Sequence, residues 1–505
     1  MPAAPSGAGK LPLLEAAWNA LNARELPRAR ELCDAVLRSA PKQPDALLLR
    51  GILQFKAGEL ARAEQSVGRA LAQKPSFPYA HYTLGLIRLE AKKIRPAALA
   101  FRRAVELDAS FAPAWSTLAL ALAQAGETAA ALDASERAVA LMPMAPEAAC
   151  VRADILTALG RLPEAIIGYQ RAVALAPTHV RASRSLAPLL ETTGRLGDAI
   201  EVLGRWRDLE PDAIAAHVAL GRLLSTVERH DDALAILEAA VARWPDDAEL
   251  HTALGNTKLT ALGLVADGLA HVRRAAALAP IAFYDSMVVF NLHYASDLSA
   301  DALHAEHLAW QRRHELPIAP AVLPKRTADP ERPLRIGFVS ADLYEHSVGR
   351  FLLPLLQAID RERFVVAAYN VVNRNRDTLT EAIEHTVDRW RSIEWPADAP
   401  IAILDDKIDI LVDLAGHTRG DLLSIFAQKC APLQVSWLGY PNSTGLSRID
   451  YRLTDAIVDP PDQTTPSSET RSGCPTGSIA SCRGGLRPSP GRCRRARMAS
   501  SRSDP

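Results

Sequence analysis

Three segments in the C-terminal part of the sequence combine glycine or histidine with hydroxyl side chains, each directly after an apolar run. They are residues 340–346, 415–420 and 439–445. Small residues leave backbone N–H groups accessible, and such groups suit the binding of a sugar or a phosphate. His346 ends the first segment, and because an imidazole titrates near neutral pH it is a candidate general acid or base. A loop histidine can equally be a solvated side chain, and spacing alone leaves this alternative open.

The elements that must position these segments alternate in type. Apolar runs predict strands at 334–340, 364–370, 408–414, 433–438 and 451–458. Helical patterns predict helices at 348–359, 376–390, 399–406 and around 422–428. This alternation predicts an α/β domain with a doubly wound parallel sheet. Ligands of such sheets bind at the carboxyl ends of the strands, where the three segments would meet. No segment contains a G-x-G-x-x-G or P-loop pattern, so a standard dinucleotide or nucleoside-triphosphate site is not indicated.

The N-terminal part of the sequence carries a regular repeat. An alanine recurs every 34 residues, at Ala29, Ala63, Ala97, Ala131, Ala165, Ala199 and Ala233. Twelve residues after each alanine, six of the seven positions are proline, namely Pro41, Pro75, Pro143, Pro177, Pro211 and Pro245. A period of 34 is that of the tetratricopeptide helix–turn–helix unit, so residues 10–280 are predicted to form eight repeats in an α superhelix. The eighth repeat, which ends at Pro280, is one residue longer than the others and is predicted to be distorted.

Stacked repeats usually bind other proteins along an extended concave surface. We expect a groove that binds acceptor proteins or peptides, and the alternative is a spacer or a dimerisation arm.

The charge of the chain is unevenly distributed. Residues 471–505 contain eight arginines and one acidic residue, so residues 1–470 contain 50 basic and 57 acidic residues. Because this larger part is mildly acidic, general nucleic-acid binding is not expected. No run of about 18 apolar residues occurs, so no membrane contact is expected, and the default location is cytoplasmic.

A connector is predicted over residues 281–331, helical to about residue 315 and rich in proline after it. The helical part contains His304, His307 and His314. The first two could share a helix face, but no acidic or cysteine pattern completes a metal site. We therefore expect these histidines on a solvated helix face, and no metal or disulfide framework in the chain.

Four stretches of the second part carry a specific resemblance. They read LRIGFVSADLYEH at 334–346, DILVDLAGHT at 409–418, APLQVSWLGYP at 431–441 and IDYRLTD at 449–455. They resemble the protein O-linked N-acetylglucosamine transferases, and the bacterial SPINDLY-like members are nearest. The resemblance implies that residues 332–463 are the first Rossmann-like half of a GT-B glycosyltransferase. It also implies inverting transfer of N-acetylglucosamine from UDP-GlcNAc or a related nucleotide sugar to Ser or Thr of proteins that the repeats select, without a cofactor.

The resemblance assigns site residues by matching motifs. His346 corresponds to a histidine for which a base role is proposed in the family, and Asp342 lies in the same loop. The family's sugar-binding loop corresponds to Gly439, Tyr440 and Pro441. The remaining expected substrate-binding residues are His417, Thr418 and Thr444. Two positions depart from the family pattern, Ser347 where proline is common and Asn442 where glycine is common.

The resemblance stops near residue 470, whereas the family continues with a second Rossmann-like half that holds the diphosphate of the donor. Residues 464–505 are rich in Arg, Gly, Ser and Pro without an apolar period, and are predicted to be an aberrant, basic, disordered tail. A frameshift or sequencing error is the favoured origin of this segment, and the alternative is a basic arm for nucleic acid or acidic lipid. We therefore expect little or no transferase activity from the 505-residue chain. The alternative function is that of a catalytically inactive tetratricopeptide scaffold for protein–protein interaction.

Overall fold

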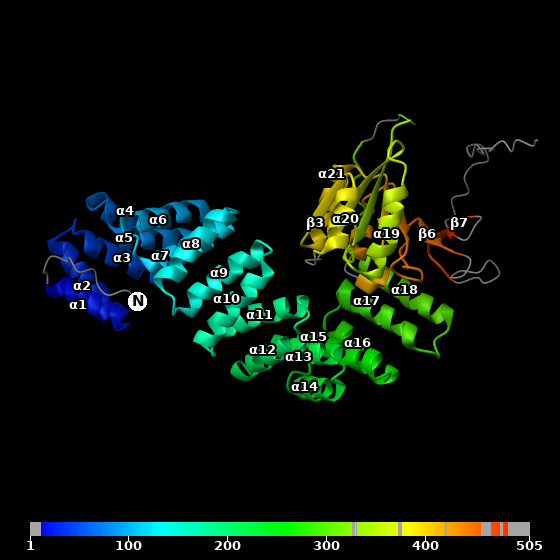
Figure 1. Ribbon diagram of the computed structural model, residues 1–505, viewed down its shortest axis with the longest axis horizontal. Coiled ribbons are helices and arrows are strands. Elements are labelled where there is room, and N and C mark those ends of the chain that lie inside the picture. Colours follow the sequence, from blue (N-terminus) through cyan, green and yellow to red (C-terminus); the bar gives the residue numbers. More distant parts are fainter. Residues whose placement is uncertain are drawn as a thin grey trace, which may run out of the picture. The chain divides into compact units, whose positions relative to one another are not determined.

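The computed structural model describes residues 12–325, 329, 331–371, 376–419, 422–455, 466–474 and 478–482. The chain divides into two compact units, Met1–Ala216 and His217–Pro505. Figure 1 labels most of their helices and some of their strands. The fold class predicted from the sequence, helical repeats followed by an α/β region with a parallel sheet, is confirmed.

The N-terminal unit consists of paired antiparallel helices. They are α1 (Pro12–Asn22), α2 (Leu26–Ser39), α3 (Pro44–Lys56), α4 (Leu60–Gln73), α5 (Pro78–Glu90), α6 (Ile94–Leu107), α7 (Ala112–Gln124), α8 (Thr128–Leu141), α9 (Pro146–Ala158), α10 (Leu162–Leu175), α11 (Val180–Thr192) and α12 (Leu196–Leu209). Several begin with proline in the first turn, where its missing N–H costs no hydrogen bond. The repeated alanines lie on the second helix of each pair and are fully buried in this unit.

The two helices of a repeat approach most closely where one carries glycine. A Cβ atom added at Gly85 on α5 would overlap the ring of Phe101 on α6. The ring therefore occupies the space that a side chain would take, and Phe101 is itself fully buried. Helices can pack at this distance only if one surface is flat at the crossing.

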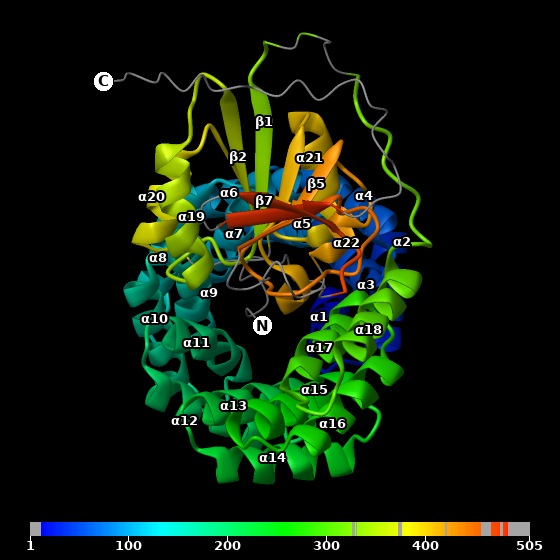
Figure 2. The ribbon, with the colours of Figure 1, turned by 90° about the vertical axis from the view of Figure 1, so that its right-hand side faces the viewer.

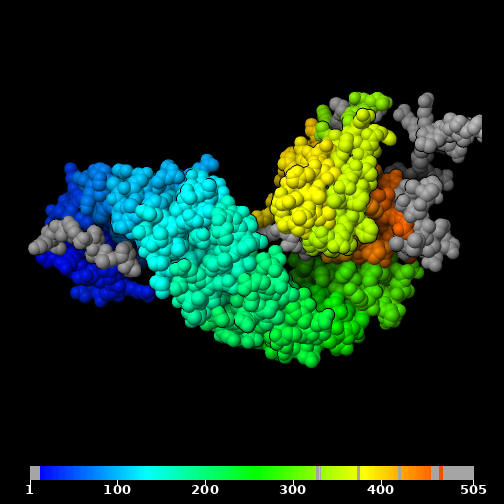
Figure 3. All heavy atoms as spheres, viewed as in Figure 1, coloured from blue at the N-terminus to red at the C-terminus, as the bar shows by residue number. Residues whose placement is uncertain are grey.

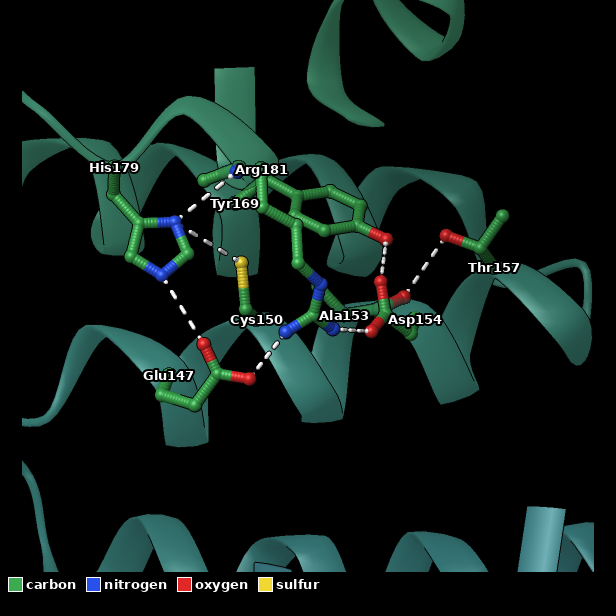
Figure 4. A network of polar contacts seen from close by, with 9 residues as sticks. Glu147, Cys150, Ala153, Asp154, Thr157, Tyr169, His179 and Arg181 are labelled. Carbon is green, nitrogen blue, oxygen red and sulfur yellow. Dashed lines mark hydrogen bonds and ion pairs between the residues drawn. The ribbon is translucent and has the colours of Figure 1, made fainter. Parts of the chain in front are cut away.

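A polar network joins α9 and α11, the first helices of two successive repeats (Figure 4). The Arg181 guanidinium on α11 pairs with both Glu147 and Asp154 on α9. The Tyr169 hydroxyl on α10 donates to Asp154 at 2.5 Å, and His179 Nε2 lies 3.2 Å from Glu147. Because these carboxylates are partly exposed, the pairs contribute little to stability and act chiefly by fixing α9 beside α11.

Cys150 also lies in this network, with its sulfur 3.9 Å from His179 Nδ1. Burial raises the pKa of the Cys150 thiol to about 12. His179 Nδ1 in addition accepts the backbone N–H of Ala182, where it caps α11. A protonated, buried thiol beside an occupied imidazole nitrogen is a packing group and does not form a nucleophile.

The C-terminal unit begins with further helices. They are α13 (Ile214–Thr226), which starts in the first unit, α14 (His230–Arg243), α15 (Ala248–Asn256), the π-helix η1 (Thr257–Ala261), α16 (Val265–Leu278), α17 (Ala282–Asn291), the 3-10 helix η2 (Leu292–Tyr294) and α18 (Ala300–His314). The distortion predicted for the eighth repeat is found in η1, directly after α15. A π turn accommodates one additional residue within a helix, and this repeat has one residue more than the others.

The α/β region of this unit is built on one sheet. Its strands are β1 (Leu334–Ser340), β2 (Phe364–Val371), β3 (Arg389–Ile393), β4 (Ile410–Asp413), β5 (Leu433–Ser436), β6 (Tyr451–Thr454), β7 (Thr470–Cys474) and β8 (Ser478–Cys482). The strand order is β3-β2-β1-β4-β5-β6-β8-β7, and all pairs from β3 to β6 are parallel. The order of the first six strands is that of a Rossmann-like, doubly wound sheet.

Helices cover both faces of the sheet. They are α19 (Ser347–Ala358), α20 (Thr378–Thr386), α21 (Ala399–Asp406) and α22 (Leu423–Phe426). Buried residues of α19 and α20 share one core cluster with β1, β2 and β4, and those of α21 and α22 share the other. In Figure 2, α19 and α20 lie on one side of β1 and β2, and α21 lies on the other.

The connector helices belong to the second of these cores. Val289 of α17 and Trp310 of α18 are buried in the cluster that contains α21 and α22. The Trp310 indole donates to the backbone oxygen of Ala282 at 3.2 Å. Figure 3 shows the yellow α/β region directly against the green helices of the same unit.

Two predictions from the sequence differ from the structure. The helix predicted over 376–390 ends at Thr386, and Arg389–Ile393 forms the edge strand β3. Two arginines of β3, Arg389 and Arg391, pair with the buried Asp406 of α21, and this contact holds β3 against that helix. Within the predicted disordered tail, 470–474 and 478–482 form the antiparallel strands β7 and β8, so the expectation of disorder does not hold for these residues. Most of the other residues of that range lie outside the described part of the chain.

Among the described residues, no helix is both long and apolar enough to cross a bilayer.

The tight crossing at Gly85 yields a stability prediction. Gly85→Ala should lower the stability of the N-terminal unit by about 1–3 kcal/mol, because Phe101 must leave its rotamer. Gly68→Ala on α4 is the matched control, since an added Cβ there meets no atom within 4 Å. The control should be neutral or stabilising by up to about 1 kcal/mol, as expected from helix propensity. Circular dichroism melting curves of both variants would test this, and equal midpoints would contradict it.

Candidate functional site

The three segments singled out from the sequence follow β1, β4 and β5, which are neighbours in the sheet. The pairs β1–β4 and β4–β5 are parallel, so the three segments leave the sheet at the same edge. The carboxyl edge of an open parallel sheet is the usual position of its ligand site. The sheet therefore brings the segments to one edge, as the sequence predicts.

The loop after β1 presents His346 at the start of α19. His346 is the N-cap residue of that helix, and its Nδ1 accepts the Val348 N–H at 3.3 Å. Because Nδ1 is the acceptor, Nε2 carries the ring hydrogen in this arrangement. The ring is half-buried and lies 5.7 Å from the ring of Tyr344. Asp342 is also half-buried, and its backbone N–H donates to the Ser340 hydroxyl at 2.9 Å.

The loop after β4 is organised by the buried carboxylate of Asp413. This carboxylate accepts the backbone N–H groups of Ala415 and Gly416 at 2.9 and 3.0 Å and lies 3.3 Å from the Ser436 hydroxyl. Burial raises the pKa of Asp413 to about 6, against the opposing effect of these hydrogen bonds. Asp413 thus fixes the start of the 3-10 helix η4 (Gly416–Arg419).

His417 and Thr418 lie in η4, with different surroundings. His417 is fully buried, with Nε2 2.8 Å from the Thr444 carbonyl and Nδ1 3.0 Å from the Ser286 hydroxyl of α17. Burial lowers its pKa well below the ordinary value, so the ring is neutral. Thr418 is half-buried, and its hydroxyl donates to the Ala415 carbonyl at 2.5 Å. The substrate-binding roles expected for both residues stay predictions.

The loop after β5 passes very close to the loop after β4. A Cβ atom at Gly439 would overlap the carbonyl oxygen of Leu414, so only glycine fits there. The preceding residue, Leu438, has a left-handed backbone with φ of 71°. Tyr440 then turns inward and is 4% exposed, whereas Pro441 is exposed. The face of this loop that is open to a ligand is therefore made of its backbone and Pro441.

Thr444 is held from inside the protein. Its N–H donates to Glu469 at 2.5 Å, and its hydroxyl pairs with the same carboxylate. The neighbouring Ser443 hydroxyl also donates to Glu469, at 2.7 Å. Since Thr444 and Glu469 are both fully buried, this contact fixes the end of the loop.

The connector supplies side chains that the sequence analysis missed. His307 on α18 is fully buried, with its Nε2 2.8 Å from the Tyr440 hydroxyl. His314 Nε2 lies 2.5 Å from the buried carboxylate of Asp285 on α17. The prediction of a solvated helix face is therefore wrong for His307 and His314. Their three-to-four-residue spacing with the buried Trp310 is the signal that could have identified a packed face.

Five aromatic or imidazole rings meet at this joint. His307, His417 and Tyr440 have ring centroids 5.2 to 5.9 Å apart, and His293 and Trp310 border them. Burial raises the pKa of Tyr440 and lowers the pKa of His307 to about 4, so Tyr440 and His307 are neutral at physiological pH. Among the described residues, no group of three or more His, Cys, Asp or Glu side chains is arranged to hold a metal ion.

The chain combines helical repeats with a Rossmann-like α/β domain, in which three loops meet at the carboxyl edge of the sheet. The tetratricopeptide repeat models match residues 14–80, 53–112, 116–179 and 190–257. The model of glycosyl transferase family 41 matches residues 262–475. The chain thus carries tetratricopeptide repeats and a glycosyl transferase family 41 domain, as the resemblance seen in the sequence implies.

Individual relatives agree with this assignment. A protein of Arabidopsis thaliana named probable UDP-N-acetylglucosamine–peptide N-acetylglucosaminyltransferase SPINDLY is 38% identical over 175 residues, which are 30% of this chain and 19% of the relative. The protein of that name from Oryza sativa is 37% identical over 213 residues, which cover 37% of this chain and 23% of the relative. The chain therefore spans about a fifth of the length of these curated relatives.

A solved structure resembles the chain over a longer stretch. It is a mutant O-GlcNAc transferase of Thermobaculum terrenum, with 34% sequence identity and a TM-score of 0.52. The match covers 58% of this chain and 56% of that one.

The buried histidine of α18 yields a pH prediction. The ordinary pKa of 6.5 applies in the unfolded chain, whereas His307 in the folded unit binds a proton only near pH 4. The contribution of His307 to the free energy of unfolding is therefore fully present above about pH 6.5, and it is lost as the pH falls toward about 4. Between about pH 8 and pH 5 the loss amounts to about 2 kcal/mol. His307→Gln cannot titrate and should lack this part of the loss.

Urea unfolding of the wild type and His307→Gln at both pH values would measure the difference. Contributions of Asp413 and other titrating groups are common to both proteins and cancel in the comparison. An equal loss of stability in the two proteins would contradict a neutral, buried His307.

Proposed function

We propose that this protein is a protein glycosyltransferase that moves N-acetylglucosamine from UDP-GlcNAc or a related nucleotide sugar to Ser or Thr of an acceptor protein. The observation that carries the proposal is the match of residues 262–475 to glycosyl transferase family 41. The convergence of three loops on the carboxyl edge of the sheet supports it. The names of the relatives from Arabidopsis and Oryza support the choice of sugar and of a peptide acceptor.

In this proposal His346 and Asp342 act on the acceptor hydroxyl. With Nδ1 occupied by the Val348 N–H, the Nε2–H group of His346 can donate a hydrogen bond and orient an oxygen atom. Removal of a proton by the same ring needs Nε2 to be free, and hence requires the other tautomer and release of the cap. The N-terminus of α19 adds a favourable field for an anionic group near His346.

The substrate-binding set divides by exposure. Pro441 is exposed and Gly439 is half-buried, and these two residues would contact the sugar through the ring and the backbone, with the half-buried Thr418 at the neighbouring loop. Tyr440, His417 and Thr444 are buried, so we propose that they serve the substrate by holding these loops.

The repeats would select the acceptor. In the N-terminal unit, Tyr79, Tyr82 and Phe111 form a half-buried aromatic cluster, with ring centroids 5.0 to 6.2 Å apart. The two tyrosines lie on α5, the first helix of its repeat, and stacked repeats use extended concave surfaces for binding. We propose that acceptor proteins bind along this surface.

A transfer assay tests the proposal. The 505-residue chain is incubated with UDP-GlcNAc and acceptor proteins, and incorporation of the sugar into Ser or Thr is measured by mass spectrometry. His346→Asn keeps a side chain that caps α19 well but removes the imidazole. It should lower kcat about 100-fold or more without a change in melting temperature. His385→Asn, at an exposed histidine of α20, is the matched control and should keep full activity.

The alternative is a scaffold without transferase activity. It predicts background incorporation for the wild type and for His346→Asn alike, together with binding of partner proteins to the repeats. The expectation of little or no activity drawn from the sequence predicts the same result for the assay. Robust transfer that depends on His346 would overturn both.

A further inference from the structure

We propose that helix α18 is part of the positioning apparatus of the transfer site, with His307 and Glu315 as positioning residues for the loop 439–448. The inference rests on the proposed function for the role of this loop, which is contact with the sugar. It adds that a helix outside the α/β fold, in the connector after the repeats, determines the shape of the loop. Three independent contacts between the connector and the loop fix it from Tyr440 to Arg448.

The first contact fixes Tyr440. His307 Nδ1 lies 2.8 Å from the Leu303 carbonyl, which can only accept, so Nδ1 carries the ring hydrogen. Nε2 is then an acceptor, and the Tyr440 hydroxyl donates to it at 2.8 Å. Both side chains are buried. Without this acceptor the buried hydroxyl would be unsatisfied, which would lower the stability of the fold by about 1–3 kcal/mol. The bond therefore selects one orientation of Tyr440 and of the Gly439 backbone beside it.

The second contact is a close approach of backbones. Gly445 has φ of 79°, and an added Cβ would lie 2.7 Å from the carbonyl oxygen of His307. The loop thus passes directly over the turn of α18 that carries His307. Between these two points Asn442 Nδ2 lies 3.3 Å from His293 Nε2, another connector residue.

The third contact fixes the end of the loop. The Glu315 carboxylate at the C-terminus of α18 accepts the N–H of Ser447 at 2.9 Å and the N–H of Arg448 at 2.8 Å. The Ser447 hydroxyl donates to the same carboxylate at 3.0 Å. Glu315 is fully buried, and such a charge persists in the interior only with several donors around it. Packing alone would not need these directed bonds, since apolar residues could fill the same volume.

These contacts join the loop to the repeats through a short path. Helix α17 packs on α16 of the last repeat, and Ser286 of α17 donates to His417, whose Nε2–H donates to the Thr444 carbonyl. Both connector helices thus hold the loop, α18 directly and α17 through His417. The geometry of the proposed sugar loop depends on the connector, and residues of the sheet alone do not determine it.

Hydrogen exchange of the full chain tests this without reference to activity. Amide exchange of residues 439–448 is measured by mass spectrometry in the wild type, His307→Phe, Tyr440→Phe and the double variant. Each single variant should raise the exchange rate of the loop about tenfold, since each removes one partner of a buried hydrogen bond. The double variant should be no faster than the faster single variant, because both remove the same bond. His307→Gln can still accept from Tyr440 and, like the control His385→Asn, should stay near the wild type.

Unchanged loop exchange in Tyr440→Phe, or additive effects in the double variant, would overturn the inference. Tyr440→Phe keeps the test decisive if His307→Phe fails to fold. In the transfer assay the two single variants should lower kcat by the same factor, about tenfold, and His307→Gln should restore most of it. Absence of transfer by the wild type would contradict the proposed function, whereas the exchange data would still decide the role of α18.

Discussion

The hydrogen bond between His307 and Tyr440 is the contact around which the C-terminal unit is organised. Burial of a polar group is unfavourable unless its partner is in place, and at this joint the partners come from different parts of the chain. A connector helix supplies the acceptor, and the loop after β5 supplies the donor. Because neither partner can be solvated, the loop, the helix and the sheet must assemble together. This requirement gives the joint a single arrangement of neutral rings where apolar packing would permit several.

Both parts of the chain use glycine for the same physical purpose, which is close approach. In the repeats, Gly85 lets a helix lie against the ring of Phe101, and at the carboxyl edge Gly439 lets one loop cross the carbonyl oxygen of Leu414. The first contact stabilises a scaffold that is uniform along its length. The second brings a backbone segment to the edge where a ligand would bind. Shape at these two positions is set by the absence of a side chain.

Sequence reasoning recovered the repeats and five of the six parallel strands because these depend on local periodicity. The alanine period of 34 residues needs only neighbouring repeats to be satisfied, and all its alanines in the N-terminal unit are buried. The strand β3 was missed because its arginines make the segment look solvated. Their partner, Asp406, lies elsewhere in the sequence. The buried histidines were missed for the same reason. His307 looks like a solvated residue until Tyr440, which lies 133 residues away, is placed beside it.

The π turn η1 makes the eighth repeat different from the repeats before it. This difference limits where repeats can be gained or lost. Upstream units have the same number of residues and present equivalent surfaces to their neighbours, so a whole unit could be gained or lost there without disturbing the next. The eighth unit carries the additional residue, and its helix α16 contacts α17. Duplication or deletion is therefore compatible with the joint only on the N-terminal side of this turn. The array is modular at one end and fixed at the other.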